Sequence, residues 1–130
     1  MKVAYLDSSC LVAIAFGERG AAALARRLTS FDELVASNLL EAELRASFVR
    51  ENVDVDSGLL GGLSWIIPDR PLTPEIVRVL EAGYVRGADC WHLATALYLA
   101  EDPALLWFLT LDERQERVAH ELGFETLDSK

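Results

Sequence analysis

The sequence predicts an α/β fold built on a mostly parallel β-sheet. Short apolar runs alternate with longer segments of helical periodicity, and several helical segments begin at a serine, asparagine, threonine or aspartate directly after the apolar run. This alternation is typical of parallel strands joined by crossover helices. The chain has 130 residues, of which 52% are hydrophobic and 25% charged, so we expect a single globular domain over residues 1–130 with its own core.

The N-terminal half shows the alternation twice. The first apolar run ends at Asp7, where Ser8 or Ser9 can cap the following helix, and the second ends at Ser37 or Asn38, either of which can cap another helix. We predict strands at residues 3–6 and 33–36, and helices at residues 10–16, 20–28 and 38–50.

The C-terminal half begins with an irregular stretch. Glycines and prolines interrupt residues 51–74, where we expect a broken helix. Thr73-Pro74-Glu75 is typical of a helix start because proline is favoured in the first turn, and Gly123 is typical of a helix end. We predict strands at residues 65–67, 105–109 and 124–127, and helices that begin at Thr73 or cover residues 87–100 and 113–122.

Composition narrows the classes of function. The net charge of −9 argues against a broad basic surface for nucleic acid, but it is compatible with an enzyme that holds a phosphodiester through metal ions, or with a basic partner segment. No apolar run approaches the roughly 20 residues that span a bilayer, and no targeting segment precedes Asp7. One pair of cysteines, Cys10 and Cys90, is no disulfide framework. We therefore expect a cytoplasmic protein without membrane contact.

Four acidic residues stand out by their placement: Asp7, Glu43, Asp89 and Asp112. Asp7 and Asp112 follow predicted strands, whose carboxyl ends form the ligand-binding edge of open α/β sheets. Glu43 lies among apolar neighbours of its helix, where an ionised side chain is costly unless it is paired or bound to metal. Asp89 shares the inward face of its helix with Leu93. We therefore expect the four carboxylates to gather at one place.

Each acid also has a purely structural interpretation. Asp7 and Asp89 are acids in the first turns of helices, and Asp112 with Gln115 resembles a capping box. Glu43 would then lie at the edge of the apolar stripe or pair with Arg50. The nearby Glu41 is expected to pair with the arginine four residues later, in solvent, and is not a candidate.

The four acids together predict a divalent metal site. Carboxylates at close range cannot all stay ionised without a neutralising cation, and Mg²⁺ takes oxygen ligands, usually one or two carboxylates with waters and substrate phosphates. Four carboxylates could serve one ion or two ions about 3.5–4 Å apart. His92 and His120 show no zinc-ligand spacing, and we interpret both as structural.

Four segments carry a resemblance to a known family. They are Tyr5-Leu6-Asp7-Ser8-Ser9, Glu41-Ala42-Glu43-Leu44, the segment of residues 86–96 (RGADCWHLATA), and Leu109-Thr110-Leu111-Asp112. In this order and at this spacing they resemble the PIN-domain nucleases, and within that superfamily the VapC toxins of toxin–antitoxin pairs. Cys90-Trp91 departs from the smaller, apolar pair more usual after the third acid, and the glycines near Gly58 are loose for a helix.

The resemblance implies a three-layer α/β/α sandwich and Mg²⁺- or Mn²⁺-dependent cleavage of single-stranded RNA. It also implies inhibition by a cognate antitoxin and assembly as a homodimer. Carried over by position, Asp7, Glu43, Asp89 and Asp112 would be the catalytic metal-binding acids. Ser9 and Thr110 would be hydroxyl residues that support them.

Other readings stay open at this point. Arg45, Arg86 and Arg114 flank the acidic motifs and could contact RNA phosphates, or they could be ordinary surface arginines. The same fold could serve as an idle binding module, and an aspartyl-nucleophile phosphatase is disfavoured because Ser9 stands where its second acid is usual. The chain has many large aromatic residues for so small a core, which favours an exposed apolar surface for self-association. Packing in the core is the default interpretation for each of them. They are Trp65, Tyr84, Trp91, Trp107 and Phe108.

Overall fold

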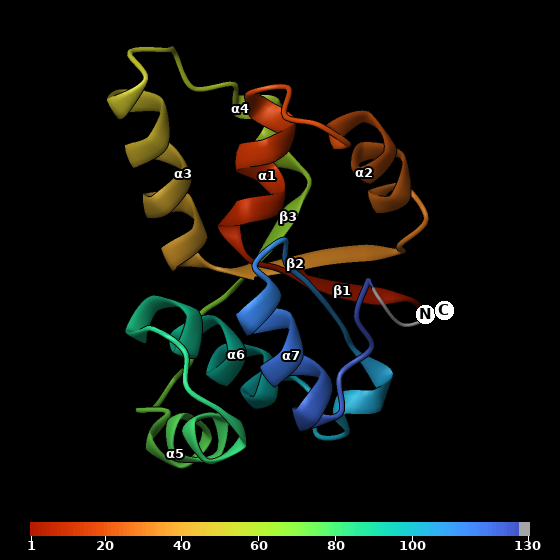
Figure 1. The fold of residues 1–130 in the computed structure, drawn as a ribbon, viewed down its shortest axis with the longest axis vertical. Helices are drawn as coiled ribbons and strands as arrows, with labels where there is room; N and C mark the ends of the chain where they lie inside the picture. The colour runs from red at the N-terminus through yellow and green to blue at the C-terminus, as the bar shows by residue number, and fades with distance from the viewer. Residues whose placement is uncertain (128–130) are drawn as a thin grey trace.

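The computed structural model of the protein describes residues 1–127 (Figure 1). Its centre is a four-stranded sheet in which every pairing is parallel, with the strand order β3-β2-β1-β4. The strands are β1 (Val3–Leu6), β2 (Glu33–Ser37), β3 (Leu63–Ile66) and β4 (Trp107–Leu109). The predicted α/β class with a parallel sheet is therefore confirmed.

Helices cover both faces of the sheet, which gives the three-layer α/β/α sandwich (Figure 1). One layer consists of α1 (Ser8–Ala15), α2 (Ala21–Leu28), α3 (Asn38–Arg50) and α4 (Ser57–Gly61). The other consists of α5 (Thr73–Ala82), α6 (Gly87–Leu99) and α7 (Glu113–Leu122).

Alternation along the strands divides the interior into two apolar cores. Tyr5 and Phe108 are fully buried on the face covered by α5, α6 and α7, and their rings stack with centroids 5.3 Å apart. Leu6 and Leu109, the next residues of the same strands, are fully buried on the face covered by α1 to α4. Both faces of the sheet are covered, which is the usual environment of an all-parallel sheet.

Short polar residues start the helices that follow the strands, as the sequence predicts. The Asp7 side chain caps α1 by accepting a hydrogen bond from Ser9 N, and Ser37 caps α3 by accepting one from Leu39 N. At the other end of the chain, α7 stops at Gly123, whose φ of 103° is left-handed and suits glycine. These caps fix the direction in which the chain leaves each strand.

The second strand ends at Ser37, one residue later than predicted, and three other strands differ more from the predictions. The third strand ends at Ile66, so the predicted 65–67 strand is shifted and Ile67 is 74% exposed. The predicted 105–109 strand begins only at Trp107, because Asp102 caps a 3₁₀ turn over Pro103–Leu105. Residues 124–127 form no full strand; Glu125 makes one isolated parallel bridge to Trp107, in which Phe108 N donates to Glu125 O at 2.8 Å.

The strand order reverses beside β1. The chain runs from β1 through β2 to β3 on one side, and β4 then returns to the opposite side of β1. Ligands of open α/β sheets bind at such a reversal, outside the carboxyl ends of the strands. The two strands remain joined there, since Asp7 N donates to Leu109 O at 3.2 Å. Asp7 and the segment after Leu109 therefore meet at the expected ligand-binding edge.

Two other sequence expectations concern the molecule as a whole. Cys10 and Cys90 are buried and free, in agreement with the absence of a disulfide framework. No helix among the described residues is long and apolar enough to cross a membrane.

Candidate active site

Asp7 forms the buried centre of the site. Its carboxylate is 4% exposed and accepts hydrogen bonds through both oxygens. Oδ1 accepts from Ser9 N at 3.1 Å and Ser9 Oγ at 2.6 Å, and Oδ2 lies 2.9 Å from Thr110 Oγ1. Burial raises the pKa of Asp7 to about 6, although the hydrogen bonds from Ser9 and Thr110 and the field of nearby His92 act in the opposite direction. The two predicted supporting hydroxyls thus contact the first predicted acid directly.

A buried glutamine links Asp7 to the next acid. Gln115 is fully buried, and its Oε1 lies 2.8 Å from Thr110 Oγ1. Its Nε2 donates to the backbone oxygen of Asp89 at 3.2 Å. The first turn of α7 is therefore joined to the first turn of α6, and Asp89 is held beside the strand ends.

Glu43 pairs with His92 and not with Arg50. Its Oε1 lies 2.7 Å from His92 Nε2, while Arg50 bonds to the neighbouring Glu51. His92 is 1% exposed, and its Nδ1 lies 2.8 Å from the hydroxyl of Tyr5. The expectation of a structural histidine with satisfied nitrogens is confirmed, and that histidine orients one of the predicted acids.

The hydrogen-bond network gives both ring nitrogens of His92 a partner. The Tyr5 oxygen accepts from Ser37 N at 3.1 Å, and burial raises the pKa of Tyr5, so the hydroxyl keeps its proton. The same hydroxyl lies 2.8 Å from Nδ1 of His92, and Nε2 on the other side of the ring lies 2.7 Å from Glu43 Oε1. A chain of hydrogen bonds thus runs from the end of β2 through Tyr5 and His92 to Glu43.

Asp89 and Asp112 form the accessible part of the site. Both line a hollow of about 420 Å³. Partial burial raises the pKa of Asp89, and the negative charges of Asp112 and Glu43 raise it further, against the opposing effects of His92 and Arg86. Asp112 uses Oδ1 to cap α7, accepting from Gln115 N at 2.8 Å. The structural cap that the sequence suggested for Asp112 is therefore present, and the residue also faces Asp89.

The three candidate arginines separate into two groups. Arg86 and Arg114 line the same hollow as Asp89 and Asp112. Arg45 instead pairs with Glu41 on the exposed side of α3, with Nε 2.8 Å from Oε2, as expected for the pair four residues apart. Arg45 is thus engaged as an ordinary surface arginine.

The donor chemistry of these side chains fits a hard divalent cation. Asp7, Glu43, Asp89 and Asp112 offer only oxygen, and within residues 1–127 the Asp89 carboxylate has no hydrogen-bond partner. In the same part of the chain, no group of three or more His, Cys, Asp or Glu side chains is arranged to enclose a metal ion. Mg²⁺ is usually bound by one or two carboxylates together with several waters. This mode of binding agrees with the open arrangement of the acids, whereas a closed cage of protein ligands does not.

Three side chains that position the acids were not predicted to do so from the sequence. His92, Tyr5 and Gln115 are buried side chains whose partners come from other strands or helices. In the sequence pattern, Tyr5 is one more apolar residue of a strand, and Gln115 is only part of a helix cap. The signal available for His92 is its position three residues after Asp89, on the buried part of the same helix.

The fold and the site together define an α/β domain with an acidic, hydroxyl-supported centre at the strand ends. The PIN domain family model matches residues 4–121, a span that contains all four acids, so the chain belongs to the PIN domain family. PIN domains are generally metal-dependent nucleases. A search of curated proteins finds no significant match to this chain.

Proposed function

We propose that this PIN domain is a Mg²⁺-dependent endoribonuclease that hydrolyses phosphodiester bonds in single-stranded or loop RNA, with Mn²⁺ as an alternative ion. The observation that carries the proposal is the hollow in which Asp89 and Asp112 lie beside Arg86 and Arg114. Buried Asp7 is joined to Asp112 through Thr110 Oγ1, which accepts from Asp112 N and lies 2.9 Å from Asp7 Oδ2. The hollow combines oxygen ligands for a cation with positive groups for phosphate. Hydrolysis of a phosphodiester uses both.

Asp7, Glu43, Asp89 and Asp112 would hold the ion. When bound, a divalent ion lowers the pKa of a coordinated water and stabilises charge on the phosphoryl oxygens. Ser9 and Thr110 fix the Asp7 carboxylate through three hydrogen bonds. Such supporting contacts commonly matter about 10- to 100-fold for metal affinity or activity.

The remaining side chains position the acids and the substrate. His92 holds Glu43 at 2.7 Å, and Gln115 holds the backbone of Asp89 at 3.2 Å. Arg86 and Arg114 neutralise phosphate charge that the acids would otherwise repel. In an acidic chain, these positive groups beside the site favour phosphate approach there.

We further propose that the enzyme acts as the toxin of a type II toxin–antitoxin pair, working as a homodimer in the cytoplasm. The support is the resemblance of the four sequence motifs to VapC toxins. Growth arrest on expression, relieved by the product of a small overlapping reading frame, is the expected result. Absence of arrest by an active nuclease would contradict the toxin role.

A cleavage assay tests the nuclease proposal. Purified protein is incubated with labelled single-stranded and hairpin RNAs in Mg²⁺, Mn²⁺ or EDTA, beside Asp7→Asn, Asp89→Asn and the control Asp54→Asn. Asp54 is an exposed carboxylate outside the site. We expect metal-dependent cleavage that falls at least about 10³-fold in Asp7→Asn and Asp89→Asn and persists in Asp54→Asn.

The same assay separates the second candidate function. That alternative is a PIN-fold binding or regulatory module that keeps the four acids without catalysis. Calorimetry that shows Mg²⁺ binding without cleavage of any RNA would support that module. Cleavage that continues in EDTA would contradict the metal requirement.

A further inference from the structure

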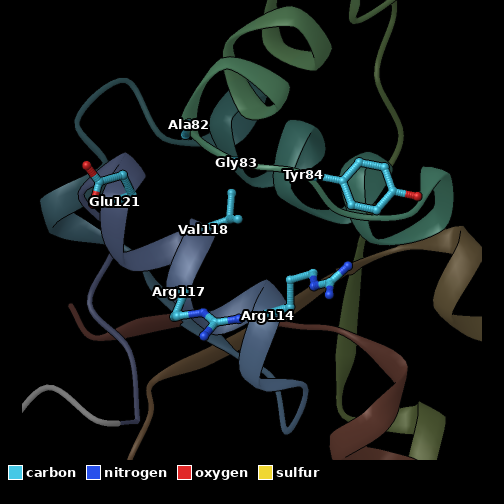
Figure 2. A pocket seen from close by; sticks show the side chains of 7 residues that line it. All are labelled: Ala82, Gly83, Tyr84, Arg114, Arg117, Val118 and Glu121. Carbon is cyan, nitrogen blue, oxygen red and sulfur yellow. The ribbon is translucent and has the colours of Figure 1, made fainter.

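The hollow that holds Asp89 and Asp112 continues along one face of α7. Arg114 and Arg117 line this hollow and also a second one of about 460 Å³, which Figure 2 shows. The second hollow reaches Gly83 and Tyr84 in the connection between α5 and α6. The two hollows share the side chains of Arg114 and Arg117, and we call the surface that the two hollows make up together the α7 groove.

The α7 groove is rich in unpaired positive charge. Arg86, Arg114 and Arg117 line it, and none of the three has an ion-pair partner among residues 1–127. Glu113 lines the first hollow beside Asp89 and Asp112, and Glu121 lines the second hollow, where Figure 2 places it at the opposite end from Arg114. In a chain with a net charge of −9, such a group of arginines favours an anionic ligand at this place.

An exposed aromatic ring stands at the mouth of the groove. Tyr84 is 67% exposed, and the Arg114 guanidinium carbon lies 5.7 Å from its ring centroid. Gly83 lets this connection lie against α7, since a Cβ at Gly83 would come within 2.9 Å of Val118 Cγ2. Aromatic rings and arginine planes beside a basic groove are the platforms on which unpaired bases stack.

We propose that the α7 groove binds a nucleotide flanking the scissile phosphate of single-stranded RNA. Arg114 and Arg117 contact its phosphate, and its base stacks on Tyr84. The inference rests on the proposed nuclease function and adds the place of the neighbouring nucleotide. It requires an unpaired base, because the faces of bases inside a duplex are already stacked on one another.

Equilibrium binding provides the direct test. Fluorescein-labelled single-stranded RNA is titrated in Mg²⁺ against Asp7→Asn protein, in which cleavage is silenced, with further substitutions Tyr84→Ala, Tyr84→Phe or Arg117→Gln. Arg78→Gln is the matched control, because Arg78 is exposed on α5 outside the groove. We expect about tenfold weaker binding for Tyr84→Ala, with most of the affinity restored in Tyr84→Phe.

Arg117→Gln should weaken binding of every RNA sequence and lower the salt dependence by about one phosphate contact. Inorganic triphosphate separates the two parts of the subsite: Arg117→Gln should weaken its binding, whereas Tyr84→Ala should leave it unchanged. In the cleavage assay with an otherwise native protein, both variants should raise KM for RNA, and Arg78→Gln should not.

The outcomes distinguish this inference from the proposed function. If the native protein cleaves RNA while Tyr84→Ala and Arg117→Gln bind and cleave as it does, the subsite is wrong and the nuclease stands. Equal losses in Tyr84→Ala and Tyr84→Phe would overturn stacking. If the native protein neither binds nor cleaves any RNA, both proposals fall.

Discussion

The candidate site has a closed side and an open side, and the two differ in what satisfies their polar groups. On the closed side Tyr5, Asp7, His92, Thr110 and Gln115 are between 0% and 4% exposed, and each has hydrogen-bond partners inside the protein. On the open side Asp89 and Asp112 line a hollow together with arginines. The comparison shows how one site can be rigid and accessible at once: buried side chains set the geometry, and the open side receives the ligand.

The largest expected effect on stability comes from breaking the closed side at Tyr5. Tyr5→Phe removes the acceptor of Ser37 N–H and the hydrogen-bond partner of His92 Nδ1, which leaves two buried groups unsatisfied. We expect a loss of about 2–4 kcal/mol in the free energy of unfolding, measured by urea denaturation. Activity should also fall, because Glu43 loses the support that reaches it through His92.

Tyr98→Phe is the matched control for that experiment. The Tyr98 hydroxyl donates to Asp69 Oδ1 at 3.1 Å on the exposed surface, where water replaces the lost partner. Its removal should cost less than about 1 kcal/mol. Equal losses in the two variants would mean that the closed side contributes nothing beyond an ordinary surface hydrogen bond.

The difference between the two sides also explains which parts of the site the sequence predicts. Asp7, Ser9 and Asp112 belong to local patterns, in which a strand ends and a cap begins, and the structure places them as expected. The all-parallel sheet follows from the same alternation of short apolar runs and helices. Local signals therefore give the fold class and the strand-end acids.

Contacts between distant segments are not available from such patterns. His92 meets Glu43 across 49 sequence positions and Tyr5 across 87, and both contacts depend on the strand order around β1. The same limit affects strand bounds: the apolar run at residues 105–109 begins in a turn because Asp102 caps Pro103–Leu105. Apolarity alone does not separate that turn from a strand.

Asp7 should make the metal-free protein less stable as the pH rises. Burial raises the pKa of Asp7 to about 6 from a usual value near 3.8, so between these values the folded state binds more protons than the unfolded state. Stability therefore falls as the pH increases from about 4 to about 6 and stays lower above that range. Asp7→Asn removes this penalty and should stabilise the metal-free protein by about 1–3 kcal/mol at pH 7.

Thermal unfolding in EDTA at pH 4 and pH 7, with Asp54→Asn as control, measures this effect. The gain of Asp7→Asn should shrink to a small part of its pH 7 value at pH 4, where the carboxyl is protonated in the folded state and the pH lies close to its usual pKa of 3.8 in the unfolded state. Added Mg²⁺ should raise the Tm of the native protein more than that of Asp7→Asn, because a ligand stabilises only the state that binds it. A metal-free variant less stable than the native protein at pH 7 would show that the Asp7 hydrogen bonds outweigh its burial.

The smallest effect is expected on the open side, at the contact between Gly83 and Val118. A Cβ at Gly83 would lie 2.9 Å from Cγ2 of Val118, a helical, β-branched residue that is 5% exposed and has little rotamer freedom to move. Gly83→Ala should therefore lower the free energy of unfolding by about 1–2 kcal/mol and displace Tyr84 from α7, which weakens RNA binding.

Gly61→Ala is the control. No atom lies within 4 Å of the Cβ added at Gly61, so this variant should be neutral or slightly stabilising. If Gly83→Ala lowers stability but leaves RNA affinity unchanged, the position of Tyr84 is irrelevant to the ligand, and the open side is limited to the hollow around Asp89 and Asp112.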